Sequence, residues 1–177
     1  MRLCLDIGHG PGRLGAEWVN LSATRLPDTD EVCVWGTDPI PFVENTFDIV
    51  HSSHCLEHIP WYQTVDALRE ARRVLKPGGR MEVWVPDFAY IVKCYHEGCC
   101  GDRWRRYNKH GDFMRWVNGR LFAYERGNEQ NFHRAVFDRP YLEQCFREAG
   151  FTTVTALDEP RSKGHPPQLQ LGVGGVK

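Results

Sequence analysis

The segment from His51 to His54, reading His-Ser-Ser-His, places two imidazoles and two hydroxyls directly after a short apolar run. Histidine has an unperturbed pKa near neutrality, so it can take a proton from a hydroxyl or an amine at physiological pH. A second histidine, His133, lies in the segment Asn-Phe-His-Arg-Ala-Val-Phe at 131–137. We therefore treat His54 and His133 as candidate catalytic bases, with a structural hydrogen-bonding role as the alternative for His133.

A glycine loop at residues 8–12, reading Gly-His-Gly-Pro-Gly, follows a strand-like run near 2–7. Glycine permits positive φ and lets the backbone approach a bound group closely, and exposed N–H groups in such a loop can bind an anion. The loop therefore predicts a ligand cradle. Because the spacing from Gly10 to Gly15 also satisfies the G-x-G-x-x-G dinucleotide pattern, an NAD(P)-dependent oxidoreductase is one alternative.

The elements that must position these groups are clearest between residues 47 and 86. A strand near 47–52 is followed by apolar residues at helical spacing over 62–75, and Pro77-Gly78-Gly79 is expected to end that helix. Alternating apolar residues then predict a strand near 80–85. Ligands of open parallel sheets bind beyond the carboxyl ends of the strands, where the residues from His51 to His54 would lie.

The rest of the chain also alternates between the two kinds of element, which favours a mostly parallel α/β sheet. The 177 residues fit one domain. Further strands are expected near 17–22, 31–35, 152–157 and 168–174, and further helices near 87–97, 103–120 and 139–149.

The two motifs together resemble the small class I S-adenosylmethionine-dependent methyltransferases, of the methyltransferase type 11 kind. The matching residues are Asp6, Gly8, Gly10, Phe47, Asp48, Val50, the Leu-Glu-His at 56–58 and the Arg-Val-Leu-Lys-Pro-Gly-Gly at 73–79. The resemblance runs from residue 2 to about residue 151. It implies a Rossmann-like sheet of seven strands in the order 3-2-1-4-5-7-6 with flanking helices, and a single domain over 1–177 with a helical acceptor-binding insertion at about 98–130.

The first crossover is compressed, since only four residues separate Gly12 from Glu17. A crossover to a parallel strand usually takes a dozen residues or more, so either the second strand is misplaced or the crossover is a bare loop. The segment Trp-Val-Asn-Leu-Ser at 18–22 matches short members of the family, except that Ser22 stands where they carry an acidic residue that holds the ribose. Ser22 can offer only a neutral hydroxyl.

The resemblance also implies roles for individual residues. S-adenosylmethionine, which leaves as S-adenosylhomocysteine, would be held by Asp6, Gly8, His9, Gly10, Ser22, Thr37, Asp38, His51, Ser52 and Ser53. Glu57 and His58 are expected to cap and pack the following segment. His133 would lie at the mouth of the site.

Seven cysteines at positions 4, 33, 55, 94, 99, 100 and 145 contain no Cys-x-x-Cys pair. The dense group of Cys94, Cys99 and Cys100 with His96 lacks the ligand spacing of a zinc ribbon, so we expect no metal there. The odd count and scatter of the cysteines, without a signal-peptide-like run, lead us to expect a reducing cytoplasm.

A net charge of −1 does not indicate a nucleic-acid or membrane partner. Basic and aromatic residues interleave between Arg103 and Arg120, and we expect an amphipathic helix there, with RNA binding as the alternative.

The resemblance implies a methyltransferase that moves a methyl group from S-adenosylmethionine, and we expect a small-molecule or sugar-like acceptor with oxygen or nitrogen as the target. A methyltransferase-like binding domain without catalysis is the main alternative. The identity of the acceptor and the oligomeric state do not follow from these patterns.

Overall fold

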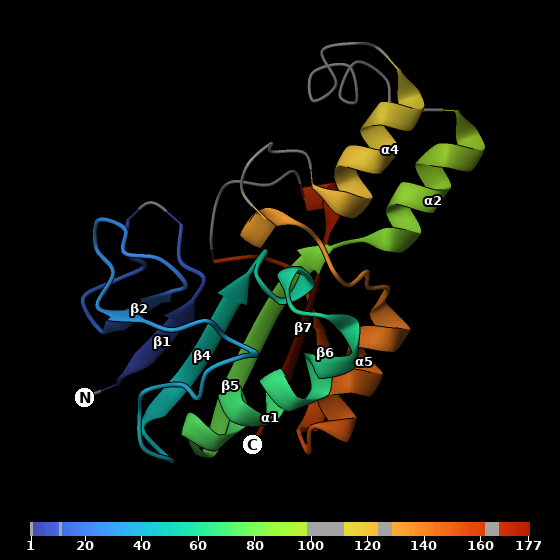
Figure 1. The fold of residues 1–177 in the computed structure, drawn as a ribbon. Helices are drawn as coiled ribbons and strands as arrows, with labels where there is room; N and C mark the ends of the chain where they lie inside the picture. The colour runs from blue at the N-terminus through green and yellow to red at the C-terminus, as the bar shows by residue number, and fades with distance from the viewer. Residues whose placement is uncertain (1, 11, 99–111, 124–128, 162–166) are drawn as a thin grey trace.

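The computed structural model describes residues 2–10, 12–98, 112–123, 129–161 and 167–177. Its centre is a seven-stranded sheet in the order β3-β2-β1-β4-β5-β7-β6, which confirms the predicted order (Figure 1). The strands are β1 (Cys4–Ile7), β2 (Trp18–Ser22), β3 (Glu31–Val32), β4 (Phe47–Ser53), β5 (Leu75–Pro86), β6 (Thr152–Leu157) and β7 (Gln170–Val176). Only β7 runs antiparallel to its neighbours β5 and β6.

Two helices, α1 (Thr64–Val74) and α5 (Arg139–Glu148), lie side by side over one face of the sheet (Figure 1). Alternate strand positions on that face are apolar, so they pack with the buried stripes of both helices into one core. Its members include Leu5, Ile7, Val50, Met81, Val83, Val85, Leu171 and Val173 from the strands, with Leu68, Ala71, Leu142 and Phe146 from the helices.

A second helix pair stands beyond the carboxyl end of β5. Helices α2 (Phe88–Glu97) and α4 (Phe113–Phe122) pack on each other around a small cluster of Ile91, Cys94, Trp116 and Val117 (Figure 1). Each begins at an aspartate, Asp87 or Asp112, whose carboxylate accepts from backbone N–H groups of the first turn. No helix in the described ranges is long and apolar enough to cross a membrane.

Three expected boundaries were wrong. Strand β5 begins at Leu75, so Pro77-Gly78-Gly79 lies inside the strand instead of separating it from α1. The strand tolerates these residues because its pairing with β4 shifts register there. The backbone there also favours both glycines: Gly78 has φ +75°, and a Cβ on Gly79 would lie 2.8 Å from the Lys76 carbonyl oxygen. Strand β3 has only two residues, 31–32, in place of the expected 31–35. Helix α4 begins at Phe113 instead of 103, and residues 103–111 of the expected helix lie outside the described residues.

The first crossover is a bare loop. Strands β1 and β2 pair in parallel, with Asp6 opposite Asn20, although the described residues between them contain no helix. The Arg13 guanidinium fixes this loop, because it donates to the Trp18 carbonyl and makes two bonds of 2.7 and 2.9 Å to the Asp30 carboxylate. A dinucleotide fingerprint needs a helix directly after its glycines, so the Gly10–Gly15 pattern has no such role here.

The second face of the sheet carries a row of polar residues. Asn20, Asp6, His51 and Glu82 share one register row across β2, β1, β4 and β5, and all four are buried. Buried polar groups are stabilised by partners from outside the sheet or within the row, although the Asn20 Oδ1 and the His51 Nε2 have no hydrogen-bond partner among the described residues.

Arg161, from the connection between β6 and β7, supplies one such partner. Its guanidinium makes two bonds of 2.5 and 2.8 Å to the Glu82 carboxylate, and it lies 5.5 Å from the centre of the Trp18 ring. This bidentate pair links the late part of the chain to strands β5 and β2 on the face away from α1 and α5.

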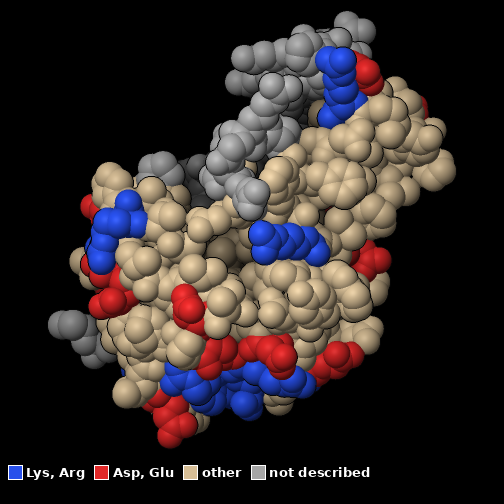
Figure 2. Space-filling model, in the orientation of Figure 1, with Lys and Arg blue, Asp and Glu red and all other residues tan. Residues whose placement is uncertain are grey.

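Charged side chains of both signs gather where α1 and α5 end, at the lower end of the molecule in Figure 2. Ion pairs within the helices, such as Arg69–Asp66 and Arg73–Glu70 in α1 and Arg147–Glu143 in α5, neutralise many of them. This end of the molecule therefore has a mixed surface charge.

Candidate functional site

Two cavities open at the carboxyl ends of the central strands, one on each side of the segment from His54 to His58. The strand-end cavity has a volume of about 120 Å³ and lies beyond β1, β2 and β3. It is lined by Ile7, Gly8, Leu21, Ala23, Cys33, Val34, Trp35, Gly36, Thr37, Cys55, His58, Ile59, Pro60, Gln63, Gln130 and Arg134. Its position agrees with the expected ligand site of an open parallel sheet.

Gly8 lets the loop after β1 touch the segment after β4. Its φ is +74°, and a Cβ at this position would lie 2.6 Å from the Cys55 Cβ and 2.7 Å from the Cys55 Sγ. The Gly8 N–H donates to the Leu21 carbonyl at 2.8 Å, which ties the same turn to β2. In contrast, a Cβ on Gly10 would meet no atom within 4 Å, so the next part of the loop borders open space.

Asp6 and His51, two predicted cofactor residues, bind each other. The Asp6 Oδ1 and the His51 Nδ1 are 2.8 Å apart, and both side chains are buried on the polar face of the sheet. Neither residue lines the strand-end cavity. Ser52 is fully buried on the strand after His51, and Ser53 ends β4 half-buried.

The remaining predicted cofactor residues divide between the cavity and the surrounding turns. Thr37 lines the cavity, whereas the Asp38 carboxylate accepts from the Val34 N–H at 3.0 Å within the same turn. The His9 ring bonds to the Gly10 carbonyl and the Thr29 hydroxyl, both at 2.8 Å. Ser22 is buried at the end of β2, and its Oγ accepts from the Thr24 N–H at 3.4 Å.

Burial raises the pKa of the Cys55 thiol to about 12, with the charge of Glu57 as the next cause. The thiol at the wall of the strand-end cavity is therefore protonated at neutral pH and does not act as a nucleophile.

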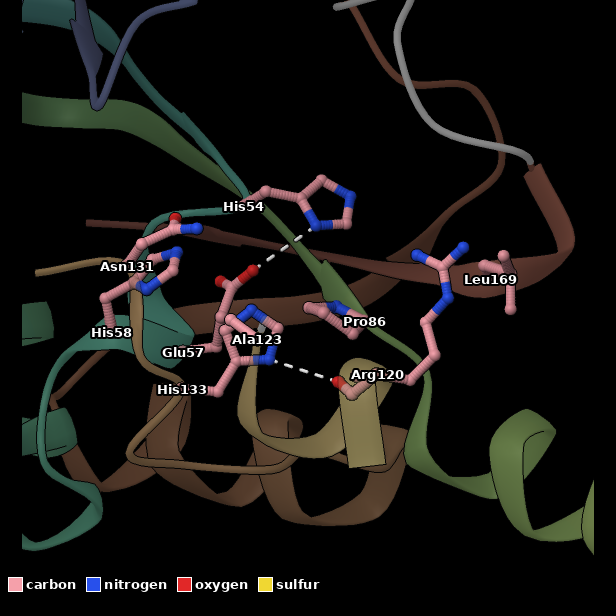
Figure 3. Close-up of a pocket in the computed structure, with 10 residues that line it drawn as sticks. His54, Glu57, His58, Pro86, Arg120, Ala123, Asn131, His133 and Leu169 are labelled. Carbon is pink, nitrogen blue, oxygen red and sulfur yellow. Dashed lines mark hydrogen bonds and ion pairs between the residues drawn. The ribbon is translucent and has the colours of Figure 1, made fainter. Parts of the chain in front are cut away.

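The second cavity, which we call the histidine cavity, has a volume of about 340 Å³. It is lined by His54, Glu57, His58, Pro86, Gly119, Arg120, Ala123, Asn131, His133 and Leu169, most of which Figure 3 labels. These residues come from the end of β4, the end of β5, the end of α4 and the segment before α5. His54 and His133, the two predicted bases, thus meet in one cavity.

Both ring nitrogens of His54 have neighbours. Its Nε2 lies 3.1 Å from the Gln170 Oε1, and its Nδ1 lies 3.3 Å from the Glu57 Oε1, the contact drawn in Figure 3. His54 also has φ +53°, a conformation that costs a non-glycine residue free energy and persists only where surrounding contacts hold it. These contacts fix the ring of His54.

Among the described residues, His133 is held by one ring nitrogen. Its Nδ1 lies 3.1 Å from the Arg120 carbonyl oxygen, so this nitrogen carries the proton and donates, and the Nε2 keeps its lone pair (Figure 3). Burial is the main cause that lowers the pKa of His133, which favours the neutral ring.

Glu57 and His58, which were expected to cap and pack the following segment, also face this cavity. Neither makes a side-chain capping bond to α1. Glu57 is 1% exposed. Burial acts to raise its pKa, but the contact with His54 outweighs burial and lowers it. The Glu57 carbonyl accepts from the Arg134 and Ala135 N–H groups at 2.7 and 3.1 Å, which brings His133 beside it.

The sequence reasoning missed Trp35 and Cys55 in one cavity, and Glu57, His58 and Arg120 in the other. The Leu-Glu-His motif was the available signal for Glu57 and His58, since it follows β4 directly. For Arg120 the signal was the basic and aromatic segment, of which residues 103–111 lie outside the described residues.

Comparison with known proteins places the chain in a family. A family model described as a methyltransferase domain matches residues 4–156. A demethylmenaquinone methyltransferase of Staphylococcus carnosus is 33% identical over 154 residues, which cover 85% of this chain and 57% of the relative. The corresponding protein of Staphylococcus haemolyticus is 31% identical over 124 residues, which cover 65% of this chain and 45% of the relative. The chain therefore spans about half the length of these curated relatives.

Solved structures share the fold at low sequence identity. A SAM-dependent methyltransferase from Archaeoglobus fulgidus has a TM-score of 0.60 at 13% identity, over 99% of this chain and 86% of the other. The 1,6-didemethyltoxoflavin-N1-methyltransferase of Burkholderia thailandensis, with S-adenosylhomocysteine and 1,6-didemethyltoxoflavin bound, has a TM-score of 0.58 at 18% identity, over 99% of this chain and 70% of the other. The family model matches most of this chain, and the sheet has the strand order of the methyltransferase fold. The chain therefore belongs to the class I S-adenosylmethionine-dependent methyltransferases.

Proposed function

We propose that the protein transfers a methyl group from S-adenosylmethionine, held partly in the strand-end cavity and partly along the open glycine loop after β1, to a small-molecule acceptor held in the histidine cavity. The observation that carries this proposal is that the two cavities adjoin along residues 54–58, and that His58 lines both. A donor and an acceptor bound in the two cavities would therefore lie next to each other along this segment. Proximity and alignment of that kind are the main requirements of methyl transfer.

The residues of the strand-end cavity suit the donor. Trp35, Val34 and Ile59 form an apolar wall suited to a flat ring. Gly8 and Gly10 offer backbone without a Cβ near the end of β1, as a cradle for the amino acid part requires. When bound, the donor supplies a methyl group already activated on a sulfonium, so the chain needs no nucleophile of its own.

The histidine cavity suits a small acceptor. Its volume of about 340 Å³ lies at the lower end of the range for small-molecule sites. Its wall combines apolar groups such as Pro86 and Leu169 with the Arg120 guanidinium and the imidazoles. Oxygen or nitrogen is the expected methyl target, because the cavity can receive the proton that such a group loses.

His133 is the better candidate for contact with the acceptor atom. Its Nε2 has no hydrogen-bond partner among the described residues, whereas both nitrogens of His54 have neighbours. We therefore propose His54 as the residue that positions Glu57, and His133 as the residue that meets the acceptor.

A binding domain without catalysis is the second candidate, and Ser22 favours it. The end of β2 offers the ribose of the donor a neutral hydroxyl in place of a carboxylate, which weakens the expected affinity. The bare first crossover removes a helix that would otherwise stand beside the donor.

Calorimetric titration of the purified chain with S-adenosylmethionine and S-adenosylhomocysteine, with NAD(H) as comparison, tests the proposal. We expect micromolar binding of both sulfur ligands, lost in Thr37→Arg, which fills the strand-end cavity. Thr155→Arg is the matched control, because Thr155 is exposed on β6. A folded protein that binds neither sulfur ligand would support the non-catalytic candidate, and binding of NAD(H) alone would contradict both.

A further inference from the structure

The ligand atoms of three side chains in the histidine cavity converge. Glu57, His58 and His133 each offer one nitrogen or oxygen, and these three atoms all lie within 4.8 Å of one another. In a tetrahedral zinc site with bonds of about 2.0–2.1 Å, ligand atoms lie roughly 3.3 Å apart. Small side-chain rotations would therefore bring the three groups to bonding distance of one ion.

Backbone carbonyls hold both imidazoles in the tautomer that a metal requires. The His58 Nδ1 lies 3.3 Å from the Phe132 carbonyl oxygen, and the His133 Nδ1 lies 3.1 Å from that of Arg120. In each ring the Nδ1 donates, so the Nε2 is left with its lone pair. Metal-binding histidines usually donate their other ring nitrogen in this way, which fixes the ring and raises its basicity.

Glu57 supplies the second, independent observation. It is 1% exposed, and neither of its carboxylate oxygens has a hydrogen-bond partner among the described residues. Among the described residues, its close polar contact is the His54 Nδ1, at 3.3 Å from Oε1. A buried carboxylate without hydrogen bonds costs free energy, and a bound cation would offset that cost.

We propose that Glu57, His58 and His133 bind one divalent transition-metal ion, such as Zn²⁺, in the histidine cavity. Two imidazoles and one carboxylate suit zinc, iron and their neighbours, whereas Mg²⁺ and Ca²⁺ prefer oxygen ligands alone. His54 then holds the Glu57 carboxylate from behind, as a second hydrogen-bonding layer around the ion. Three protein ligands leave coordination positions open toward the cavity, as in catalytic zinc sites.

The metal site gives His133 its role at the acceptor, and this part rests on the proposed function. An acceptor hydroxyl or amine bound to the cation would lose its proton more readily, and that proton would pass to solvent. His133 would then act on the acceptor as a ligand of the ion instead of as a free base.

The test is metal binding to the full chain after treatment with a chelator and its removal. Zn²⁺ is titrated by calorimetry, Co²⁺ by visible absorption, and Mg²⁺ serves as the comparison ion. We expect one Zn²⁺ per chain and Co²⁺ bands in the visible range, with affinity at least about tenfold lower in Glu57→Gln and in His58→Asn. His96→Asn is the matched control, since His96 is exposed on α2 outside the cavity.

Circular dichroism shows whether each variant is folded, and if Glu57→Gln is not, His58→Asn carries the test because His58 is only half-buried. If His58→Asn binds zinc as tightly as wild type, the zinc is bound elsewhere, for example by the cysteines, and the proposal is overturned. Equal affinity for Mg²⁺ and Zn²⁺ would also overturn it. S-adenosylhomocysteine is titrated on the same samples. If the chain binds S-adenosylhomocysteine but not zinc, only the metal site is overturned. If it binds zinc but not S-adenosylhomocysteine, only the donor site is overturned.

Discussion

The two cavities differ in where their residues come from. Most of the strand-end cavity comes from the first sixty-odd residues, at the ends of β1, β2 and β3 and in the segment after β4. The histidine cavity combines the end of β4 with residues near 86, 119–123, 131–133 and 169. The strand-end cavity, which is the proposed donor site, is thus a product of sheet topology, whereas the histidine cavity, the proposed acceptor site, depends on connections that the topology leaves free to vary. Changes that affect one cavity should leave the other intact, and the following predictions test that separation.

The largest expected effect is on turnover in His133→Asn. We expect the rate of S-adenosylhomocysteine formation, with an acceptor found by screening, to fall about 100-fold or more, because the group that meets the acceptor is lost. The dissociation constant of S-adenosylhomocysteine should stay within about threefold of wild type, since His133 does not line the strand-end cavity. An equal loss of donor affinity would show that the cavities are not separate. His96→Asn is the control.

Gly8→Ala should affect the donor side through the contact with Cys55. A Cβ 2.6 Å from the Cys55 Cβ, on a residue with φ +74°, should cost about 1–3 kcal/mol and weaken S-adenosylhomocysteine binding about tenfold. Gly98→Ala is a matched control, because Gly98 also has a positive φ of +58°, a Cβ there meets nothing within 4 Å, and the residue lines neither cavity. Thermal unfolding and calorimetry measure the two effects. If zinc affinity falls together with donor affinity, residues 54–58 transmit strain from one cavity to the other. Unchanged stability of Gly8→Ala would show that Gly8 and Cys55 do not touch.

Ser22→Asp should strengthen donor binding. A carboxylate at the end of β2 would accept a charge-assisted hydrogen bond from a ribose hydroxyl, and we expect about tenfold tighter binding, or about 1.4 kcal/mol. Ser22→Asn has a similar shape without the charge and should gain little. Competition with a fluorescent donor analogue would measure both variants. Unchanged affinity in Ser22→Asp would place the ribose away from β2.

The smallest effect concerns Glu70, which lies outside both cavities. Hydrogen bonds from Arg73, and then from the Ile40 N–H, lower the pKa of Glu70 in the folded chain. A lowered folded pKa means that this stabilisation is present above the unfolded pKa, about 4.3, and is lost as the pH falls through the folded pKa. Because the pair is partly exposed, Glu70→Gln should cost no more than about 1 kcal/mol at pH 7.

Urea unfolding at pH 7 and at progressively lower pH would measure this difference. The gap between wild type and Glu70→Gln should shrink toward acid, with no change in ligand affinity at either cavity. A gap that grows toward acid would contradict the assigned direction.

Much of the fold was predictable because it depends on local patterns. The apolar alternation around β1, β4 and β5 and the helical spacing in α1 were visible in the sequence, and the family resemblance supplied the strand order. The boundary at Leu75 was not predictable, because the register shift against β4 that admits Pro77-Gly78-Gly79 is a long-range feature. The contact between Asp6 and His51 was not predictable either, because it depends on the register in which β1 and β4 pair.

The residues of the histidine cavity were less predictable than those of the strand-end cavity. His54 and His133 were chosen for their chemistry, yet the directions of Glu57 and His58 are set by contacts with the distant segment from Phe132 to Ala135. Local capping was therefore the natural interpretation of that motif. The expectation of no metal weighed only the cysteine group, whereas the proposed ligands are separated along the sequence and come together only in the folded chain.

The insertion of β7 between β5 and β6 has a consequence for how the chain folds. Until Gln170–Val176 docks, β5 has a partner on only one side, so its other edge presents free N–H and C=O groups to any neighbouring strand. Arg161, which joins Glu82 on the same strand, also belongs to this late part of the chain. During synthesis, β5 therefore stays unpaired on one side until β7 has been made. The contacts between β5 and β7 span much of the sequence, and such contacts form slowly. Aggregation during that interval is therefore a hazard for a chain with this topology.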